Sequence, residues 1–326
     1  MHRSRLLKFA RVVGTVVAFL AFGGCFLAQP TFRSNPPSAV TVDPERLHAH
    51  VVMLSETLHP RDWTQVENLD RCADYIAGHL ARAGAVVEEQ VYEVQGRNYR
   101  NVIGRFGTGH DSKLIVGAHY DAHAGTPGAD DNASGVAALI ELAYLLGQTA
   151  PDREIELVAY TLEEPPFFRT PLMGSAVHAR GVAAESNDIR GVIVLEMVGY
   201  FSDKRWSQGF PLPVLRLFYP SRGNFIAVVG RWDQGEWVKT VKAHMKGTTA
   251  LPVYSLRAPA FIPGVDLSDH RNYWSHGLNA VMITDTAFYR NHAYHTPADT
   301  ADRLDYHRMA QVVVALYETL HTIEDP

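Results

Sequence analysis

Short β-type segments alternate with helical patterns along most of this 326-residue chain. Strand patterns cover residues 86–94, 101–104, 113–117, 154–160, 191–195 and 280–283, and helical patterns cover residues 135–147, 174–180, 232–246, 270–276 and 306–323. Alternation of this kind predicts a single α/β domain, in which helices flank both faces of a mixed, largely parallel central sheet. Ligands of such sheets bind beyond the carboxyl ends of the strands, so the residues at those ends are the candidates for function.

Composition restricts the partners and the metal chemistry of the chain. The net charge of -5 and the sequence pI near 6.3 provide no basic surface for nucleic acid, so we predict no nucleic-acid partner. The two cysteines, Cys25 and Cys72, are too few for a disulfide framework or a Cys-x-x-Cys metal pair. Cys72 falls on the apolar face of a helical pattern and is expected to be a core thiol. Any metal must therefore be held by His, Asp and Glu.

The first 30 residues are typical of a signal peptide or an N-terminal membrane anchor, because four basic residues precede an uncharged apolar stretch at residues 12–28. This charge bias predicts export of the rest of the chain to the periplasmic or extracellular face. Three outcomes remain open: the segment is cleaved and the chain released, the segment is cleaved and the chain lipidated at Cys25, or the segment is retained as a single membrane span. Residues 31–41 then indicate a flexible spacer, and residues 42–326 one domain.

The apolar run at residues 114–116 is followed by a His-x-Asp pattern. His119 and Asp121 follow it with a period of two, so an extended backbone points both side chains to the same side. His119 can then bind a metal ion while Asp121 accepts the second ring N–H and fixes the tautomer. A single His-x-Asp pair is common, and on its own it usually has no functional role.

Acidic residues also cluster in front of the helical pattern at residues 135–147. Asp131 is a candidate N-cap of this helix, a position that favours Asp. Three polar residues in a row, Asp130, Asp131 and Asn132, exceed what capping requires. Asp131 is therefore also a candidate for a carboxylate that bridges two cations.

Two adjacent glutamates, Glu163 and Glu164, follow the strand pattern at residues 154–160. Neighbours in an extended chain project to opposite sides, so one can bind metal while the other reaches a water molecule as general base. A solvent-exposed pair is the alternative. The apolar sequence Pro165-Pro166-Phe167-Phe168 comes directly afterwards and argues against free solvation.

Further candidates follow later strand patterns. Glu196 ends the apolar run at residues 191–195, and a charge in that position needs a partner. His295 is a candidate second imidazole ligand, and Tyr294 a candidate donor to an oxyanion. Asp269 and His270 either join this site or pair at the surface.

Together these residues suit two zinc ions roughly 4 Å apart that share one carboxylate. The chain, from about residue 42 onward, resembles the M28 family of co-catalytic zinc aminopeptidases, which have a zinc-exopeptidase fold of the phosphorylase/hydrolase-like type. The resemblance rests on the His-x-Asp, Asp-Asn-x-Ser-Gly, Glu-Glu and Tyr-His motifs in the order of the family. It implies two zinc ions per chain, one held by His119 and Glu196 and the other by Glu164 and His295. Asp131 would bridge the two ions.

The resemblance also implies the catalytic roles. Asp121 would orient His119, Glu163 would be the general base, and Tyr294 would stabilise the tetrahedral intermediate. The substrates would be peptides with a free N-terminus.

The chain departs from the family pattern in three places. Glu196 stands where the family commonly has Asp, and Pro165-Pro166 replaces the usual small residues after the paired glutamates. Residues 199–265 contain no motif, and we expect them to form pocket loops that set substrate preference.

The sequence therefore predicts a zinc-dependent exopeptidase of the aminopeptidase type. One alternative keeps the fold but changes the reaction, as in a glutaminyl cyclase-like acyltransferase with one zinc ion. A second alternative is a peptidase-like ectodomain without catalytic activity. Metal counting separates all three, because they require two, one and no zinc ions.

Overall fold

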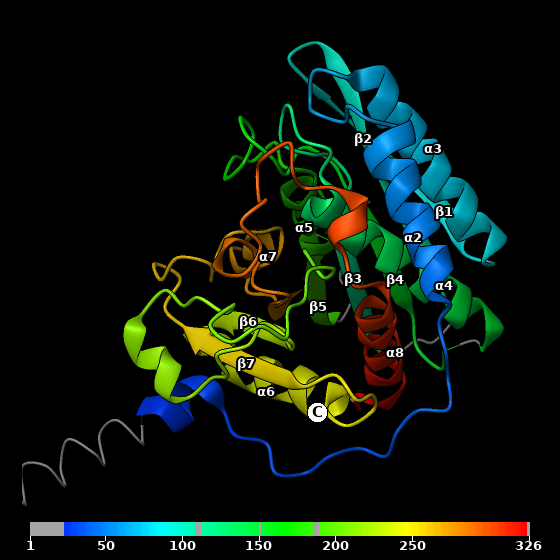
Figure 1. Ribbon diagram of the computed structural model, residues 1–326. Coiled ribbons are helices and arrows are strands. Elements are labelled where there is room, and N and C mark those ends of the chain that lie inside the picture. The colour runs from blue at the N-terminus through cyan, green and yellow to red at the C-terminus, as the bar shows by residue number, and fades with distance from the viewer. Residues whose placement is uncertain (1–22, 108–111, 150, 185–188, 325–326) are drawn as a thin grey trace, which may run out of the picture.

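The computed structural model describes residues 23–107, 112–149, 151–184 and 189–324, which form one domain around a sheet of eight strands (Figure 1). The strands are β1 (Val86–Val94), β2 (Arg97–Phe106), β3 (Lys113–His119), β4 (Ile155–Tyr160), β5 (Ile189–Glu196), β6 (Ile226–Arg231), β7 (Val253–Ala258) and β8 (Ala280–Thr284). Most of the predicted signal peptide or anchor lies outside the described residues.

The strand order is β1-β2-β4-β3-β5-β8-β6-β7. The central strands β4, β3, β5 and β8 are parallel. The hairpin of β1 and β2 is joined antiparallel to β4, while β6 pairs antiparallel with β8 and parallel with β7. This mixed sheet with a parallel centre confirms the predicted fold class. Because the central strands are parallel, their carboxyl ends meet at one edge of the sheet.

The strand prediction was incomplete at both margins of the sheet. β2 extends beyond the predicted residues 101–104, because its first half pairs with β1 beyond the end of β4. β6 and β7 lie within residues 199–265, for which the sequence analysis predicted pocket loops and no strands. Both strands have six residues; β7 is the edge strand, and β6 lies between β7 and β8.

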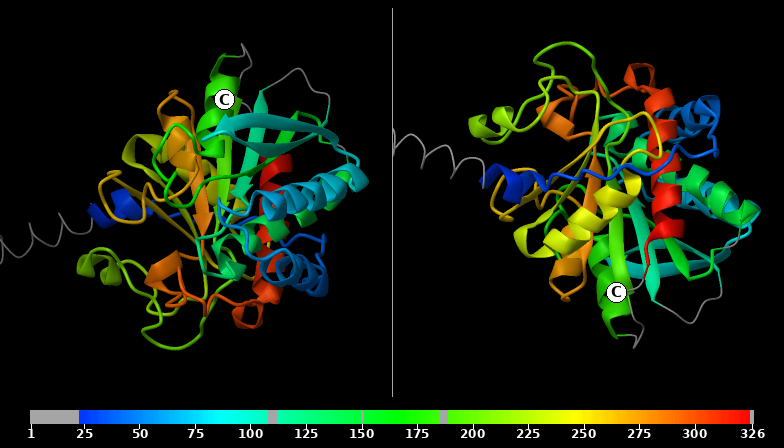
Figure 2. Two further views of the ribbon diagram at one scale, coloured as in Figure 1. Left: turned by 90° about the horizontal axis from the view of Figure 1, so that it is seen from above. Right: turned by 90° about the horizontal axis from the view of Figure 1, so that it is seen from below.

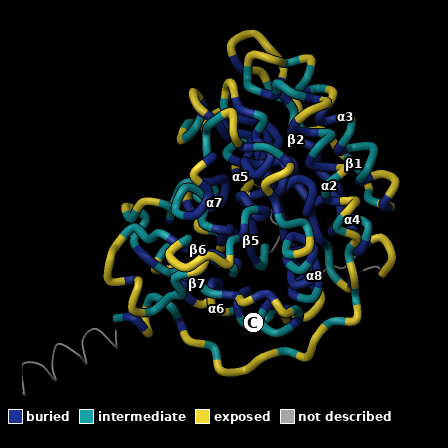
Figure 3. The backbone as a smooth tube through the Cα atoms, viewed as in Figure 1, coloured by how far each residue is buried: buried dark blue, intermediate teal, exposed yellow. Residues whose placement is uncertain are grey.

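Helices cover both faces of the sheet (Figures 1 and 2). One face is packed against α2 (Pro44–Val52), α3 (Val66–Arg82), α4 (Gly135–Gln148), α6 (Gly235–Met245) and α8 (Tyr306–Thr322). The other face is packed against α5 (Gly174–Ala184) and α7 (His270–Trp274). On β3, Leu114 and Val116 belong to the first core and Ile115 to the second, as the period of two requires. Figure 3 shows this buried centre, with exposed backbone concentrated in the outer loops.

The helix after the acidic cluster begins later than Asp131. Asp131 and Asn132 have non-helical backbone angles, and α4 begins at Gly135. The N-cap role considered for Asp131 is therefore wrong. Nearly every residue of α4 is buried, because the helix packs between the sheet and three other helices. Cys72 is also buried, as predicted, and burial raises the pKa of its thiol to about 11.

The first described residues run along the outside of the domain. Residues 23–28 are helical, and Ser255 Oγ donates a hydrogen bond to the Ala28 carbonyl at 2.9 Å. In the spacer segment, Asn35 Nδ2 donates to the carbonyls of Ala243 and His244 at the end of α6, both at 2.8 Å. Across residues 23–324 with their gaps, none of the helices is sufficiently long and apolar to cross a membrane.

Candidate metal centre

His119 is the last residue of β3, and its imidazole is completely buried. Its Nδ1 atom lies 3.2 Å from the Asp121 carbonyl oxygen and 3.4 Å from Asp121 Oδ1. The Asp121 carboxylate also accepts the backbone N–H groups of Glu163 at 3.2 Å and Glu164 at 3.1 Å. Asp121 thus fixes the paired glutamates and the His119 ring relative to one another, and Nε2 of His119 is directed to the other side.

The loop that contains Asp131 is held from two distant segments. The Asp299 carboxylate accepts the N–H of Asp131 at 3.1 Å. Asn132 Nδ2 donates to the Leu195 carbonyl at 2.8 Å, and Asn132 Oδ1 accepts the Met197 N–H at 3.0 Å. These bonds place Asp131 beside the carboxyl end of β5, where Glu196 ends the strand.

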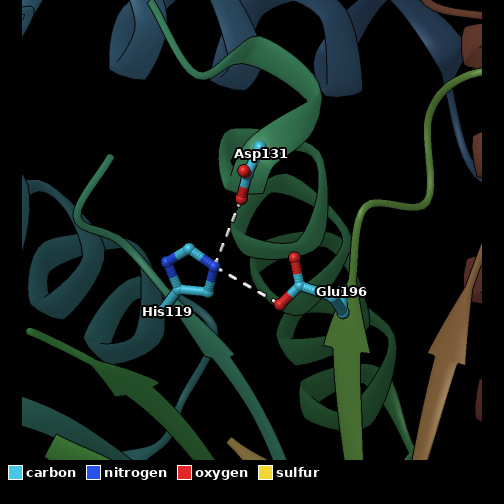
Figure 4. A group of neighbouring side chains, drawn as sticks. All are labelled: His119, Asp131 and Glu196. Carbon is cyan, nitrogen blue, oxygen red and sulfur yellow. Dashed lines mark ion pairs between the residues drawn. The ribbon is translucent and has the colours of Figure 1, made fainter. Parts of the chain in front are cut away.

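Within the part of the chain that the structure describes, two groups of three residues each could hold a metal ion, and Asp131 belongs to both. The first group comprises His119, Asp131 and Glu196 (Figure 4), and the second comprises Asp131, Glu164 and His295. Within each group the potential ligand atoms lie within 4.8 Å of one another. Asp131 contributes a different oxygen to each group, because Oδ1 lies 3.5 Å from His119 Nε2 and Oδ2 lies 3.1 Å from His295 Nε2.

The outer ligand pairs have similar separations. His119 Nε2 lies 3.4 Å from Glu196 Oε2, and His295 Nε2 lies 3.3 Å from Glu164 Oε2. Ser268 Oγ donates a hydrogen bond of 2.7 Å to Glu196 Oε2, which fixes the longer side chain that replaces the common Asp. The extra methylene of Glu196 therefore still brings its carboxylate to His119.

Three atoms at the centre of these groups are buried and lack a hydrogen-bond partner among the described residues: His119 Nε2, Asp131 Oδ2 and Glu164 Oε1. Buried polar atoms are almost always hydrogen-bonded, so three such atoms on these ligand residues indicate a missing ligand. Imidazole nitrogen and carboxylate oxygen are donors that zinc accepts. The residues present therefore fit a pair of zinc ions.

The electrostatics of the cluster also favour a cation. Burial raises the pKa of Glu164 to about 8, and the Asp131 carboxylate adds to this rise. Burial opposes the charged form of His295, but Asp131 and Glu164 outweigh this and raise its pKa to about 10. Carboxylates crowded in a buried space thus retain protons, and a bound cation relieves the same repulsion.

Glu163 borders the first group without being part of it. Its Oε2 atom lies 3.9 Å from His119 Nε2, and its side chain is almost fully buried. Burial raises the pKa of Glu163 well above its usual range, and Asp269, Glu196 and Glu164 raise it further against the effect of His119. A carboxylate with a raised pKa at this position can take a proton from water.

Two aromatic rings stack on His295. Tyr294 has a centroid distance of 3.8 Å from His295, and His123 has one of 4.2 Å. Tyr294 also lines the adjacent cavity. His123 follows the His-x-Asp motif by two residues and was not predicted as a site residue, although this spacing again places it on the same side of an extended chain.

Other residues around the site could not be found from the local sequence pattern. For Asp269 and His270, the alternative of an ion pair at the surface is wrong, because both residues are completely buried. Asp269 accepts a hydrogen bond from Ser175 Oγ, and burial raises its pKa to about 7. The buried guanidinium of Arg61 donates to the carbonyls of Tyr120 at 2.9 Å and Gly128 at 2.8 Å, which joins the segments behind His119 and Asp131.

An apolar cavity extends from Glu196 and Tyr294 toward β6 and β7. Its wall consists mainly of residues between 208 and 289, among them Phe210, Leu215, Tyr219, Tyr254 and Phe288. Much of the segment expected to form pocket loops therefore does so, together with two strands that were not expected.

Comparison with known proteins agrees with this geometry. The model of peptidase family M28 matches residues 101–320. Uncharacterized protein YfbL of Escherichia coli K12 is 46% identical to this chain over 301 residues. The aligned region covers 90% of this chain and 92% of YfbL.

Two solved structures from Bacteroides thetaiotaomicron share the fold. A glutaminyl cyclase superposes with a TM-score of 0.67 at 21% identity, covering 89% of this chain and 100% of the cyclase. A leucine aminopeptidase precursor of strain VPI-5482 superposes with a TM-score of 0.66 at 20% identity, covering 90% of this chain and 100% of the precursor. The family match and the motif order agree on one assignment, and the chain belongs to peptidase family M28.

Proposed function

We propose that this protein is a zinc-dependent aminopeptidase, which removes residues from peptides with a free N-terminus. The observation that supports this best is the division of Asp131 between two ligand groups, one oxygen facing His119 and the other facing His295. A carboxylate shared in this way suits two metal ions that act together on one substrate.

Each ligand has an assigned place in this proposal. His119 and Glu196 would hold one zinc ion, Glu164 and His295 would hold the other, and Asp131 would contribute to both sites. Zinc ions bound there supply Lewis acidity, which lowers the pKa of water and polarises a carbonyl group.

The remaining residues orient groups and move protons. Glu163 accepts a proton from the attacking water and delivers it to the departing amine, for which its raised pKa is suited. Asp121 orients His119 through Nδ1 and fixes the Glu163 backbone. Tyr294 lies beside His295 and the cavity, and its hydroxyl donates a hydrogen bond to the oxyanion of the tetrahedral intermediate. Surplus carboxylates around the centre attract the substrate ammonium, which favours action at the N-terminus.

The test combines metal analysis with a substrate panel. The purified full-length chain is analysed for zinc, stripped with a chelator and reloaded. Chromogenic aminoacyl and dipeptidyl substrates are assayed in each state, together with a peptide that begins with glutamine. We expect two zinc ions per chain and hydrolysis of aminoacyl substrates that is lost on chelation and restored by zinc.

Two results would contradict the proposal. One zinc ion per chain, together with cyclisation of the N-terminal glutamine, would establish the glutaminyl cyclase-like alternative, whose fold is equally similar. A folded chain that binds no zinc would indicate an ectodomain without catalytic activity.

A further inference from the structure

The short helix η3 (Pro213–Leu217) exposes apolar side chains on its outer side. Leu217 is 70% exposed, and its neighbours Leu212 and Val214 are also exposed. Leu215, by contrast, is buried and lines the cavity beside the metal centre. Exposed apolar residues gathered on one short segment are typical of a surface that contacts a partner or a membrane.

The N-terminal helix lies directly beside η3. A side chain at Gly24 would overlap the ring of Phe218, and the Arg257 guanidinium lies 3.7 Å from the centroid of the Phe26 ring. Figures 1 and 2 show residues 23–28 and η3 side by side. The turn at residues 259–264 follows β7, whose Ser255 and Arg257 contact residues 23–28. Phe261, in that turn, is 83% exposed. We call these three segments, residues 23–28, 212–218 and 259–264, the η3 surface.

The composition of the N-terminal apolar stretch indicates what this surface faces. Residues 12–28 contain no charged side chain, and a helix of that length would be about 26 Å long, close to the thickness of a bilayer core. Gly24 and Phe26 lie near its end, so a retained span brings their contacts Phe218 and Arg257 to the membrane surface. A lipid on the exposed Cys25 would bring the same residues there.

The charge of the surrounding segment is complementary to anionic lipid. Residues 204–222 contain four basic residues and no acidic residue, although the whole chain has a net charge of -5. The basic residues are Lys204, Arg205, Arg216 and Arg222. Basic residues beside exposed apolar groups are the composition of an interfacial segment, and each is attracted to an anionic membrane surface.

We propose that the η3 surface lies on an anionic phospholipid bilayer. The N-terminal segment attaches the chain, and Leu217 and Phe261 enter the boundary between headgroups and acyl chains. Because the opposite side of η3 lines the cavity, the contact also fixes the orientation of the candidate metal centre relative to the membrane. The aminopeptidase activity is not required for this contact.

The test measures the surroundings of single positions in the full-length chain. An environment-sensitive fluorophore is attached to Leu217→Cys. Cys25→Ser is added where the N-terminal segment is retained as a span, whereas a lipidated Cys25 is kept because the lipid blocks its thiol; the remaining thiol, Cys72, is buried. The matched control is Val91→Cys on β1, which is also exposed and lies at the far side of the domain (Figure 1). Both proteins are reconstituted into vesicles of equimolar phosphatidylcholine and phosphatidylglycerol.

We expect the fluorophore at position 217 to shift to the blue and to be quenched by lipids that bear a quencher on the acyl chain. The fluorophore at position 91 should show neither effect. Arg216→Glu with Arg222→Glu should reduce the shift at position 217. Equal behaviour of the two positions would overturn the proposal, and an equal shift in phosphatidylcholine alone would contradict the role of the basic residues. A shift that appears without vesicles and grows with protein concentration would identify a second copy of the chain as the occupant.

Discussion

Two buried polar clusters depend on the same central strands, and they differ in whether the protein completes them. The candidate metal centre lies at the carboxyl ends of β3 and β5. The second cluster surrounds Glu156, a completely buried residue of β4. Glu156 accepts hydrogen bonds from Arg105 at 2.9 Å and Lys113 at 3.2 Å, and it is bonded to His178 at 2.9 Å.

The second cluster continues through hydroxyl groups until every member has a partner. His178 is bonded through Nδ1 to the Tyr273 hydroxyl at 2.7 Å, and this hydroxyl is bonded to that of Tyr160 at 2.6 Å. None of these side chains is among the buried atoms that lack a partner in the described residues. In the candidate metal centre, three ligand atoms have none.

The pKa values of two glutamates express the same difference. Burial opposes the charged form of Glu156, but His178, Lys113 and Arg105 outweigh it and lower its pKa to about 2. Burial and Asp131 raise the pKa of Glu164 to about 8. A complete cluster stabilises its charges within the fold, whereas an incomplete one requires a cation from outside. Incompleteness, more than burial or charge, therefore distinguishes the candidate metal centre from the Glu156 cluster.

The largest expected effect tests the candidate metal centre. Glu163→Gln should lower kcat by about 10²–10⁴-fold, because the amide cannot accept the proton from water. Zinc content should stay the same, and stability should stay the same or rise, since a crowded buried carboxylate is removed. Kinetics on aminoacyl substrates, metal analysis and urea unfolding measure the three quantities. Near-normal turnover in a folded, zinc-loaded variant would remove Glu163 from the mechanism.

The same substitution in the complete cluster should act on stability. Glu156→Gln should lower the free energy of unfolding by about 3 kcal/mol, because His178, Lys113 and Arg105 lose a carboxylate whose pKa the fold lowers from 4.5 to about 2. Zinc content and kcat of the folded fraction should not change. Urea unfolding measures the loss, and Glu154→Gln, at a more exposed member of the same ion-pair group, is the matched control. A large loss of kcat with unchanged stability in Glu156→Gln would contradict the comparison, because the Glu156 cluster would then act on catalysis and not on stability.

The central strands could be predicted from sequence because their burial leaves local patterns. Residues 114–116 form a continuous apolar run, and the observed strand β3 continues it only as far as His119. The candidate ligands could be placed for the same reason, since each follows such a run or a motif. The early helix α2 was missed, although Asp43 accepts the N–H of Glu45 as N-cap and Pro44 occupies the first helical position, a common signal for a helix start.

The residues that complete the site act over distances that no local pattern encodes. Asp299 holds the N–H of Asp131 from 168 positions away in the chain. Arg61 joins four carbonyl groups from separate segments, and its pKa is lowered by its burial. Such contacts depend on how the whole chain packs. Sequence therefore predicted the candidate ligands, but not the residues that hold their loops in place.

The smallest expected effect is a difference in sign between the two clusters as pH changes in zinc-free protein. The pKa of Glu156 is lowered, so its contribution to stability is present above 4.5 and is lost as pH falls toward about 2. The pKa of Glu163 is raised, so the folded state binds more protons above 4.5 and its contribution falls as pH rises. The difference in free energy of unfolding between wild type and Glu156→Gln should therefore become smaller as pH falls. The free energy of unfolding of Glu163→Gln should rise relative to that of wild type as pH increases. Urea unfolding across this pH range measures both differences. If both differences in free energy of unfolding changed in the same direction with pH, the clusters would not differ in the way proposed. Only opposite proton linkage makes the two differences change in opposite directions.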